Sequence, residues 1–340
     1  MSSIDSMTAW VIDDYETDGF RRTVLPKPVA GEGEVLVAVR ASAFNPIERK
    51  ILSGQVRIAP PFPAILNGDV SGVVEAVGPG VEGFAPGDAV FGCAGGFVHS
   101  QGALADYCTV RADSVTHAPT NLDLADAAAL PIAMISAWYA LVDQAQLKTG
   151  QRVLVMGGTG GVGHLGVQLA VALGADVYAA CGTDEKCALA CELGAHSAYN
   201  YRTIPPGDVA EHFTAQQGFD VVFDTAGGQS LANALEVVRY GGKVVTIAGR
   251  GTHDLTPAHG KGVSIHMVMM LNPFFTGTGW AHYGDILRET VDLVEAGSVR
   301  PLIDDERFTF DTLSDAHRYA SLGHHMGKIL LDHPAAPMLA

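Results

Sequence analysis

The chain has 340 residues, 48% of them hydrophobic, and a mean hydropathy of +0.20, which fits a globular protein of two domains and excludes a disordered one. Its formal net charge of −16 argues against nucleic acid or a membrane surface as a partner, because phosphate contacts need clustered Lys and Arg. The five cysteines are scattered and the first residues do not resemble a signal peptide, so a cytoplasmic location is expected.

The first 125 or so residues predict a compact β-rich domain. Residues 34–40 (EVLVAVR) and 72–77 (GVVEAV) have the composition of short strands. Proline and glycine turns separate such segments at residues 60–63, 78–80 and 86–88. We therefore expect turns and short strands in this part of the chain, with few helices.

From residue 123 onward, helices and strands are predicted to alternate, which indicates a parallel sheet with helices on both faces. The predicted elements are a helix at 126–144, strands at 153–156 and 176–180, helices at 162–173 and 185–193, a strand from 220, a helix at 230–239 and a strand from 241. The apolar stretch 127–142 is interrupted and too short to span a bilayer comfortably.

The end of the chain is predicted to return to the first domain. Residues 263–271 suggest one more strand, 274–279 an aromatic and glycine-rich link, 283–296 a helix, and 328–332 a last strand. The expected domains are therefore 1–128 with 276–340, and 129–275.

A glycine turn in the second domain predicts a dinucleotide site. The buried-strand pattern at 153–156 leads into Gly158, Gly160 and Gly163, which match G-x-G-x-x-G, and an apolar helix follows. In this motif the first glycine permits the turn, the second admits the pyrophosphate, and the third allows the helix to lie close to the strand. The helix N-terminus then faces the anion. Thr159, Gly161 and Val162 complete the predicted loop.

With these motifs, the sequence resembles the medium-chain dehydrogenase/reductase superfamily, and within it the zinc-free quinone oxidoreductase branch. The resemblance rests on residues 77–92, 45–48, 129–141, 200–202 and 327–331 as well as the glycine loop. It implies an α/β protein with a GroES-like β-rich catalytic domain and a Rossmann domain with a doubly wound parallel sheet. One departure is local: relatives have G-x-D-x-A/S-G where this chain has Asn67-Gly68-Asp69-Val70-Ser71-Gly72, so the glycine is displaced by one position.

The positions that hold catalytic zinc in alcohol dehydrogenases of this superfamily lack suitable ligands here. They correspond to Asn45 or its neighbours, to residues 67–69, and to residues 134–136, and none offers a thiolate or imidazole. The four-cysteine structural cluster is also missing, because only Cys93 and Cys108 lie between residues 90 and 110. We expect no zinc and no other metal site.

The expected cofactor is NADPH, with NADH as the less favoured alternative. The strand end at Cys181 lacks the carboxylate that usually binds the ribose of NAD. Thr183, Lys186, Tyr201 and Arg202 instead offer hydroxyl and cationic groups for a 2′-phosphate, although Asp184 or Glu185 lies near enough to reach the ribose after a small loop shift. Cys187 and Cys191, four residues apart on one helix, are interpreted as core residues.

The resemblance implies further site residues near the cofactor. Asn45 is expected near the nicotinamide ribose or the substrate oxygen and Ser136 near the carboxamide or ribose, both as positioning residues. The remaining predicted cofactor contacts are Gly182, Ala226, Gly227, Ala248, Gly249 and Lys328. No tyrosine occurs at residues 52–57, where enoyl-thioester reductases carry a proton donor, and no role is assigned to His99, Tyr107, His282 or Tyr283.

These features favour an NADPH-dependent oxidoreductase that reduces a quinone or an α,β-unsaturated carbonyl by hydride transfer without metal. Such acceptors are already electrophilic, so the cofactor supplies the chemistry and the protein supplies position. The alternatives are an alcohol dehydrogenase with unusual zinc ligands and a non-catalytic NADPH-binding structural or regulatory protein. A homodimer is expected, with a tetramer as the alternative, because pairing of the apolar edge segment 263–271 across a two-fold axis would cover it.

Overall fold

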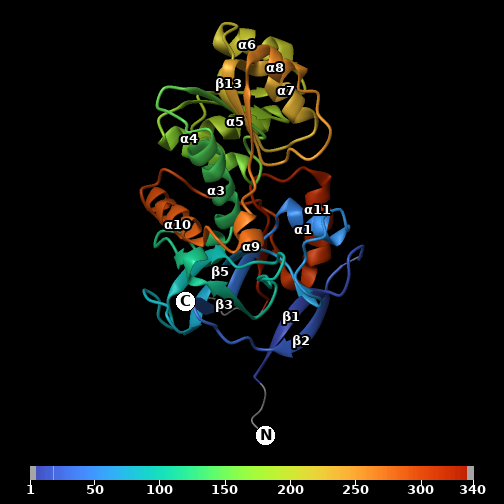
Figure 1. Ribbon diagram of the computed structural model, residues 1–340, viewed down its shortest axis with the longest axis vertical. Helices are drawn as coiled ribbons and strands as arrows, with labels where there is room; N and C mark the ends of the chain where they lie inside the picture. The colour runs from blue at the N-terminus through green and yellow to red at the C-terminus, as the bar shows by residue number, and fades with distance from the viewer. Residues whose placement is uncertain (1–4, 18, 335–340) are drawn as a thin grey trace. The chain divides into compact units, whose positions relative to one another are not determined.

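The computed structural model describes residues 5–17 and 19–334, and the chain divides into two compact units (Figure 1). Unit 1 comprises residues 1–132, 271–296 and 303–340, and unit 2 comprises residues 133–270 and 297–302. These boundaries differ by a few residues from the expected domains. Segment 297–302 also lies in unit 2, whereas the sequence had placed it in the first domain.

Unit 1 is built around β-sheets. The smaller sheet has the order β2 (Arg21–Pro26), β1 (Ser6–Ile12), β4 (Ala64–Ile65). The larger has the order β15 (Phe308–Thr309), β16 (Leu330–Asp332), β3 (Glu34–Ala43), β5 (Asp69–Val77), β6 (Ala89–Cys93), β8 (Val115–His117), and β7 (Tyr107–Arg111) also pairs with β3. Its helices are α1 (Pro46–Leu52), η1 (Ala112–Ser114), α2 (Leu124–Ala127), α9 (Asn272–Thr276), α10 (Trp280–Glu295), η3 (Phe310–Thr312) and α11 (Leu313–Leu322).

Unit 2 contains the predicted parallel sheet, and the α/β fold class is confirmed. Its strand order is β11 (Ser197–Asn200), β10 (Asp176–Cys181), β9 (Arg152–Met156), β12 (Phe219–Asp224), β13 (Val238–Thr246), β14 (Ser264–Met267), all parallel. The helices are α3 (Pro131–Trp138), which begins at the unit boundary, η2 (Tyr139–Gln144), α4 (Gly163–Ala172), α5 (Asp184–Glu192), α6 (Pro206–Thr214), α7 (Gln229–Val237) and α8 (Thr256–Lys261).

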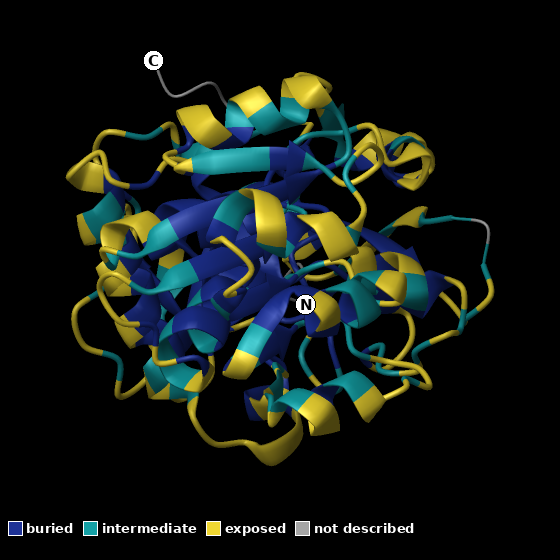
Figure 2. Ribbon diagram, turned by 90° about the horizontal axis from the view of Figure 1, so that it is seen from above, coloured by how far each residue is buried: buried dark blue, intermediate teal, exposed yellow. Residues whose placement is uncertain are grey.

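The direction of the chain across this sheet reverses between β9 and β12. From β9 the strands proceed outward to β10 and β11, and the chain then returns to β12 and proceeds the other way. Right-handed crossovers therefore place the two sets of helices on opposite faces. The buried strands between them form a core that includes Leu154, Val222 and Val244. In Figure 2 the buried parts of the chain are dark blue and the exposed parts yellow. A ligand is expected beyond the carboxyl ends of the strands at this point of reversal.

Several sequence predictions need correction. The segment 274–279, expected as a link, begins inside α9. The helix expected at 230–239 ends at Val237, because Val238 already belongs to β13. The strand expected over 263–271 is limited to β14, which is four residues long. Helices α6, α8 and α11 were not predicted.

The apolar helical run is longer than the sequence indicated. Residues 124–144 form one stretch of 21 residues with a mean hydropathy of 1.5, long and apolar enough to cross a membrane by length and composition alone. However, 78% of its most apolar window is buried inside the protein, as is usual for a core helix of a water-soluble protein. This run is therefore weak evidence for a membrane span.

Candidate functional site

The turn between β9 and α4 is built by glycines at a different position from the one expected. Gly157 has φ +80°, so the left-handed turn begins there, one residue before the Gly158 to which the sequence had assigned it. Gly158 is required for another reason, because a Cβ placed on it would lie 2.7 Å from the Cβ of Ala179 in β10. The sequence had not singled out Gly157.

Gly160 and Gly163 of the same loop have different surroundings. A Cβ on Gly163 would lie 2.0 Å from the carbonyl oxygen of Gly157, so only glycine lets α4 begin this close to the end of β9. A Cβ on Gly160 would meet only that same oxygen within 4 Å, at 3.3 Å. The protein therefore leaves space over Gly160, which fits a site where a ligand approaches the backbone.

The end of β10 gathers the residues proposed for cofactor selectivity. Thr183 caps α5, and its Oγ1 accepts a hydrogen bond from the backbone nitrogen of Lys186 at 3.2 Å. The backbone nitrogen of Tyr201 donates to the carbonyl oxygen of Cys181 at 3.0 Å. A Cβ on Gly182 would lie 2.8 Å from the Tyr201 hydroxyl oxygen. Thr183 and Lys186, at the start of α5, and Tyr201, which follows β11, therefore lie at the same end of the sheet.

Asp184, which the sequence left as a rival contact to the ribose, is held by a neighbouring strand. Its Oδ1 accepts a hydrogen bond of 2.8 Å from Asn200 Nδ2 at the end of β11. The same Asn200 accepts, through Oδ1, a hydrogen bond of 3.0 Å from the backbone nitrogen of Arg202. The carboxylate of Asp184 is thus directed toward β11.

The ends of β12 and β13 are tied together by a buried carboxylate that the sequence analysis missed. Asp224 Oδ1 accepts hydrogen bonds from the backbone nitrogens of Ala226 and Gly227 at 3.1 and 3.0 Å, and its Oδ2 accepts one of 2.8 Å from Thr246 Oγ1. The Thr246 hydroxyl in turn accepts from the backbone nitrogen of Ala248 at 3.1 Å. Asp224 and Thr246 therefore fix the backbone of three predicted contact residues.

Glycines complete the same strand ends. Gly227 has φ +73°, and a Cβ there would lie 2.2 Å from the carbonyl oxygen of Ala248. At Gly249 a Cβ would lie 2.4 Å from the sulfur of Met267. Gly227 is therefore required by the close approach of the Ala248 backbone, whereas at Gly249 the flexible, exposed side chain of Met267 can move aside.

In unit 1, a second group of polar residues is buried around Asn45. Asn45 precedes α1, where Pro46 supplies a fixed φ and Glu48 accepts a hydrogen bond of 2.6 Å from the Asn45 backbone nitrogen. Asn45 Nδ2 donates to Asp69 Oδ2 at 2.8 Å. Lys328 Nζ donates to Asn45 Oδ1 at 2.6 Å and to Asp69 Oδ2 at 2.9 Å. We call Asn45, Glu48, Asp69 and Lys328 the buried quartet.

The buried quartet contains two carboxyl groups and one ammonium group. Glu48 and Asp69 are 0% exposed and Lys328 is 3% exposed. Burial raises the pKa of Glu48 from 4.5 to about 8; the Lys328 ammonium opposes this rise and the Asp69 carboxylate adds to it. Burial beside the same two carboxyl groups also raises the pKa of the Cys93 thiol. With Asp69 paired to Lys328, a neutral Glu48 leaves the quartet without excess charge.

In the turn before Asp69, Asn67 takes the position at which relatives have glycine. Asn67 has φ +68°, a left-handed conformation that asparagine tolerates better than most residues. Its Nδ2 donates to the carbonyl oxygen of Ala43 at 3.1 Å. Gly68 is needed for space, because a Cβ there would lie 2.7 Å from Ile132 Cδ1 and 2.9 Å from the Gly95 oxygen. The turn that positions Asp69 is thus kept by an Asn-Gly pair.

The other predicted residues are distributed as follows. Ser136 is buried in α3, and Thr159 is buried with its side chain hydrogen-bonded to Cys181. The Cys187 thiol is hydrogen-bonded to Cys181. Cys187 is only half-buried and Cys191 is exposed, so the interpretation of this pair as core residues is wrong. Burial raises the pKa of Cys181 to about 12, so this thiol is a poor nucleophile. Asn45 and Lys328 belong to unit 1, and all other predicted site residues belong to unit 2.

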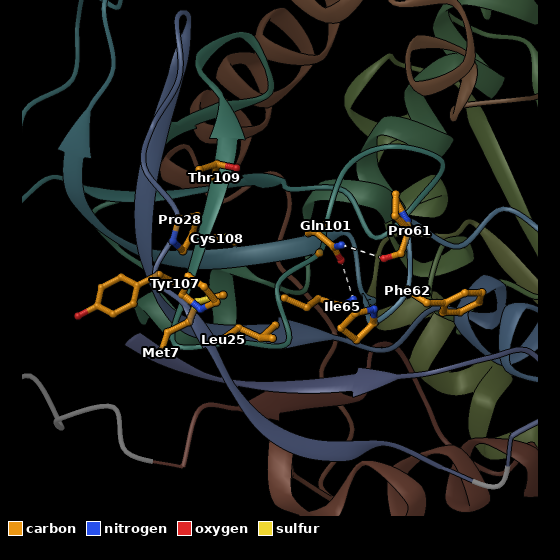
Figure 3. A pocket seen from close by; sticks show the side chains of 13 residues that line it. Met7, Leu25, Pro28, Pro61, Phe62, Ile65, Gln101, Tyr107, Cys108 and Thr109 are labelled. Atoms are coloured by element: carbon orange, nitrogen blue, oxygen red, sulfur yellow. Dashed lines mark hydrogen bonds between the residues drawn. The ribbon is translucent and has the colours of Figure 1, made fainter. Parts of the chain in front are cut away.

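A separate cavity of about 440 Å³ lies in unit 1 (Figure 3). Its lining includes Met7, Leu25, Phe62, Ile65 and Tyr107. Figure 3 also shows Gln101 in this lining, where its side-chain amide is bonded to the backbone of Pro61 and Ile65. None of the predicted site residues lines this cavity, so it is not the candidate site.

No group of three or more His, Cys, Asp or Glu that could hold a metal ion occurs within residues 5–17 and 19–334. Of the positions corresponding to catalytic zinc ligands, Asn45 and Asp69 belong to the buried quartet. Asn45 and Asp69 there share the Lys328 ammonium. The donor set in this region therefore does not fit a zinc ion.

Two models of known protein families match parts of this chain. Residues 31–120 match the family model described as "Alcohol dehydrogenase GroES-like domain", and residues 161–295 match that described as "Zinc-binding dehydrogenase". The human protein named quinone oxidoreductase is 32% identical over 236 residues, which cover 69% of this chain and 70% of that protein.

Two further proteins are similar along nearly the whole chain. The Arabidopsis thaliana protein named NADPH-dependent alkenal/one oxidoreductase, chloroplastic, is 32% identical over 334 residues, covering 96% of this chain and 79% of that protein. The crystal structure of an alcohol dehydrogenase superfamily protein from Novosphingobium aromaticivorans has a TM-score of 0.91 at 38% identity. That match covers 96% of this chain and 99% of the solved one.

Proposed function

The chain belongs to the medium-chain dehydrogenase/reductase superfamily, in its quinone oxidoreductase branch, and on this premise we propose that it reduces a quinone or an α,β-unsaturated carbonyl with NADPH, without a metal ion. The observation that carries the proposal is the arrangement of unit 2. There the space over Gly160 and the group Thr183, Lys186 and Tyr201 lie at the ends of adjacent strands. The names of the human and Arabidopsis relatives support the class of acceptor.

The residues present fit a dinucleotide with a 2′-phosphate. Gly158, Gly160 and Gly163, with Thr159, Gly161 and Val162, would hold the pyrophosphate at the start of α4. Thr183, Lys186 and Tyr201 would hold the 2′-phosphate, and the carboxylate of Asp184 already accepts a hydrogen bond from Asn200. We therefore propose NADPH as the preferred cofactor and NADH as the weaker one.

The remaining proposed contacts orient the reacting end of the cofactor. Asp224 and Thr246 hold the backbone at Ala226, Gly227 and Ala248, so these strand ends offer a fixed edge for the ribose and nicotinamide. Ser136, in the same unit, is proposed to position the same end, and the proposed positioning role of Asn45 rests on the family resemblance alone. When bound, NADPH supplies the hydride to an acceptor carbon that is already electrophilic. The protein then needs only to orient the reactants and exclude water.

No metal is required by this proposal, because no hydroxyl group of an unactivated alcohol must lose a proton. At the zinc-ligand positions, Asn45 offers an amide, and Asp69 is already paired with the Lys328 ammonium. An alcohol dehydrogenase with unusual zinc ligands and a non-catalytic NADPH-binding protein remain the competing interpretations that the experiment below separates.

The test is oxidation of NADPH and of NADH, in parallel, by the purified protein with a panel of quinones and enones. The expected result is turnover with at least one acceptor of each kind and a higher kcat/KM with NADPH than with NADH. Tight binding of NADPH without turnover on any acceptor would favour the binding protein. Turnover confined to alcohols and dependent on added zinc would favour the alcohol dehydrogenase.

We propose further that the protein is a cytoplasmic homodimer. None of the five cysteines forms a disulfide bond, which suits a reducing compartment. Strand β14 is the edge of the parallel sheet, and its Met267 is 55% exposed. Pairing of this edge with a second copy would cover it. Light scattering at the assay concentration would contradict this if it gave the mass of a single 35.6 kDa chain.

A further inference from the structure

Three cysteines of unit 2 follow one another from the surface inward. Cys191 is exposed, Cys187 is half-buried one helical turn before it in α5, and Cys181 is buried at the end of β10. The side chains of Cys181 and Cys187 are hydrogen-bonded to each other, so these two thiols are in direct contact. The proposed function gives neither thiol a role. Two touching thiols, one of which solvent reaches, are an arrangement that an oxidant converts to a disulfide.

Cys187 has two candidate partners for a disulfide, and the geometry favours Cys181. Cys187 and Cys191 are four residues apart on one helix, where the Cβ atoms of such a pair are about 5–6 Å apart. A disulfide needs Cβ atoms about 3.5–4.5 Å apart, so a bond between these two would distort α5. Cys181 instead belongs to β10, which the short link 182–183 joins to α5. The pair that already touches therefore needs the smaller rearrangement.

Cys187 is the thiol of this pair that reacts first with an oxidant from solvent. Cys181 is only 2% exposed, and burial raises its pKa to about 12. Partial burial also raises the pKa of Cys187 and the Asp184 carboxylate adds to this, but the hydrogen bond with Cys181 opposes the rise. Because the oxidant must reach the sulfur and the thiolate is the reactive form, the attack falls on Cys187.

Cys181 also contacts the glycine loop, so a change at this sulfur reaches the candidate site. The sulfur accepts hydrogen bonds from the side chain of Thr159 and from the backbone nitrogen of Gly158. On the other side of the pair, Lys186 directly precedes Cys187 in the first turn of α5. A disulfide holds its sulfurs about 2.05 Å apart, closer than any hydrogen bond, and would draw Cys181 and the start of α5 together. Both neighbourhoods are those that the proposed function assigns to the phosphates of NADPH.

We propose that Cys181 and Cys187 form a reversible disulfide when a peroxide reaches Cys187, and that this modification weakens the binding of NADPH. The effect on NADPH rests on the proposed function, whereas the disulfide itself does not. Disulfides in the cytoplasm are usually transient and redox-sensing, which agrees with a pair that is reduced in this structure.

The reaction has two steps that balance. The Cys187 thiolate attacks one peroxide oxygen, the O–O bond breaks, and the sulfur becomes a sulfenic acid while the released hydroxide takes up a proton as water. The Cys181 sulfur then attacks the electrophilic Cys187 sulfur, the S–O bond breaks, and the departing hydroxide leaves with the Cys181 proton as a second water. The two thiols lose two electrons, which the peroxide gains. A thiol reductant reverses the bond by exchange.

The experiment treats the purified full chain with hydrogen peroxide, removes the excess, and measures the disulfide and the Kd of NADPH. Mass spectrometry of unreduced peptides is expected to find Cys181 linked to Cys187. Fluorescence titration is expected to give the oxidised protein a Kd about fivefold above that of the reduced protein, the loss typical of one neutral hydrogen bond. Treatment with dithiothreitol is expected to restore the original Kd.

Cys187→Ser and Cys191→Ser are matched variants, because both replace a thiol on α5 and only the first breaks the pair. After peroxide treatment, Cys187→Ser is expected to keep the Kd of the reduced wild type, and Cys191→Ser is expected to respond as the wild type does. Thermal unfolding is measured for each protein. Should Cys187→Ser fail to fold, Cys187→Ala makes the same test.

Three results would contradict this account. A missing link between Cys181 and Cys187, or a link between Cys187 and Cys191 in its place, would overturn the inference. A mapped Cys181–Cys187 link with an unchanged Kd of NADPH would overturn the effect on binding. If the reduced wild-type protein binds neither NADPH nor NADH, the proposed function fails, and peptide mapping still decides whether the disulfide forms. The two failures are therefore distinguishable.

Discussion

Replacing Glu48 with glutamine is expected to change how the stability of the protein depends on pH. Burial beside Asp69 raises the pKa of Glu48 from 4.5 to about 8. In the unfolded chain this carboxyl group ionises near its ordinary value, so between these two pH values the folded protein holds a proton that the unfolded chain has lost. The free energy of unfolding therefore falls as pH rises through this window, and levels off above it.

The size of the effect follows from the width of that window. One pH unit corresponds to about 1.4 kcal/mol, so the full contribution is roughly 5 kcal/mol and its change between about pH 5.5 and about pH 7.5 is roughly 3 kcal/mol. The Glu48→Gln variant has no such proton to lose. Relative to the wild type, it should therefore gain that amount as pH rises across the window.

The assay is urea unfolding followed by circular dichroism at several pH values, with wild type and variant in parallel. Glu75→Gln, which removes an exposed carboxylate from β5, the strand that carries Asp69, is the matched control. We compare the difference in the free energy of unfolding between wild type and variant, because a chain of two units need not unfold in one step. Parallel curves of stability against pH for wild type and Glu48→Gln would refute the assignment of a protonated, buried Glu48.

Three further predictions concern unit 2. Gly163→Ala should destabilise the protein by about 3 kcal/mol or more, because its Cβ would lie 2.0 Å from the Gly157 oxygen. Gly160→Ala should instead leave the melting temperature nearly unchanged and weaken NADPH binding. Thermal unfolding and cofactor titration check this pair, and a large loss of stability in Gly160→Ala would contradict it. Asp224→Ala should cost about 1 to 3 kcal/mol in chemical unfolding, because it leaves the buried Thr246 hydroxyl and two part-buried backbone donors without their acceptor; a loss below about 1 kcal/mol would count against this account. Lys186→Ala should reduce the ratio of kcat/KM for NADPH to that for NADH about tenfold or more, and an unchanged ratio would remove Lys186 from the 2′-phosphate site.

The local features of the fold were predictable because their signals lie within a few residues of one another. The strand, glycine turn and apolar helix around Gly160 follow one another directly in the sequence. The left-handed residue of that turn was still assigned to the wrong glycine, because Gly157 and Gly158 are adjacent and spacing alone does not show which one has a positive φ. Helix and strand boundaries such as Val237 and Val238 failed for a similar reason, since valine suits a strand and is tolerated in a helix.

The polar networks were not predictable, because they join residues that are distant in sequence. Lys328 lies 283 residues from Asn45, and Thr246 lies 22 residues from Asp224. A signal was present in each case: Asp224 and Thr246 each follow an apolar run at the end of a strand, and Lys328 lies two residues before another strand. A polar side chain at the end of a buried strand needs a partner, but the sequence does not show which residue provides it.

The most direct test of the central claim is NADPH oxidation by protein that has been dialysed against a chelator and shown by metal analysis to contain no zinc. The account predicts that this protein still reduces a quinone and an enone, with kcat/KM unchanged by the treatment and not increased by added zinc. Loss of turnover on removal of metal, with recovery when zinc is restored, would contradict it.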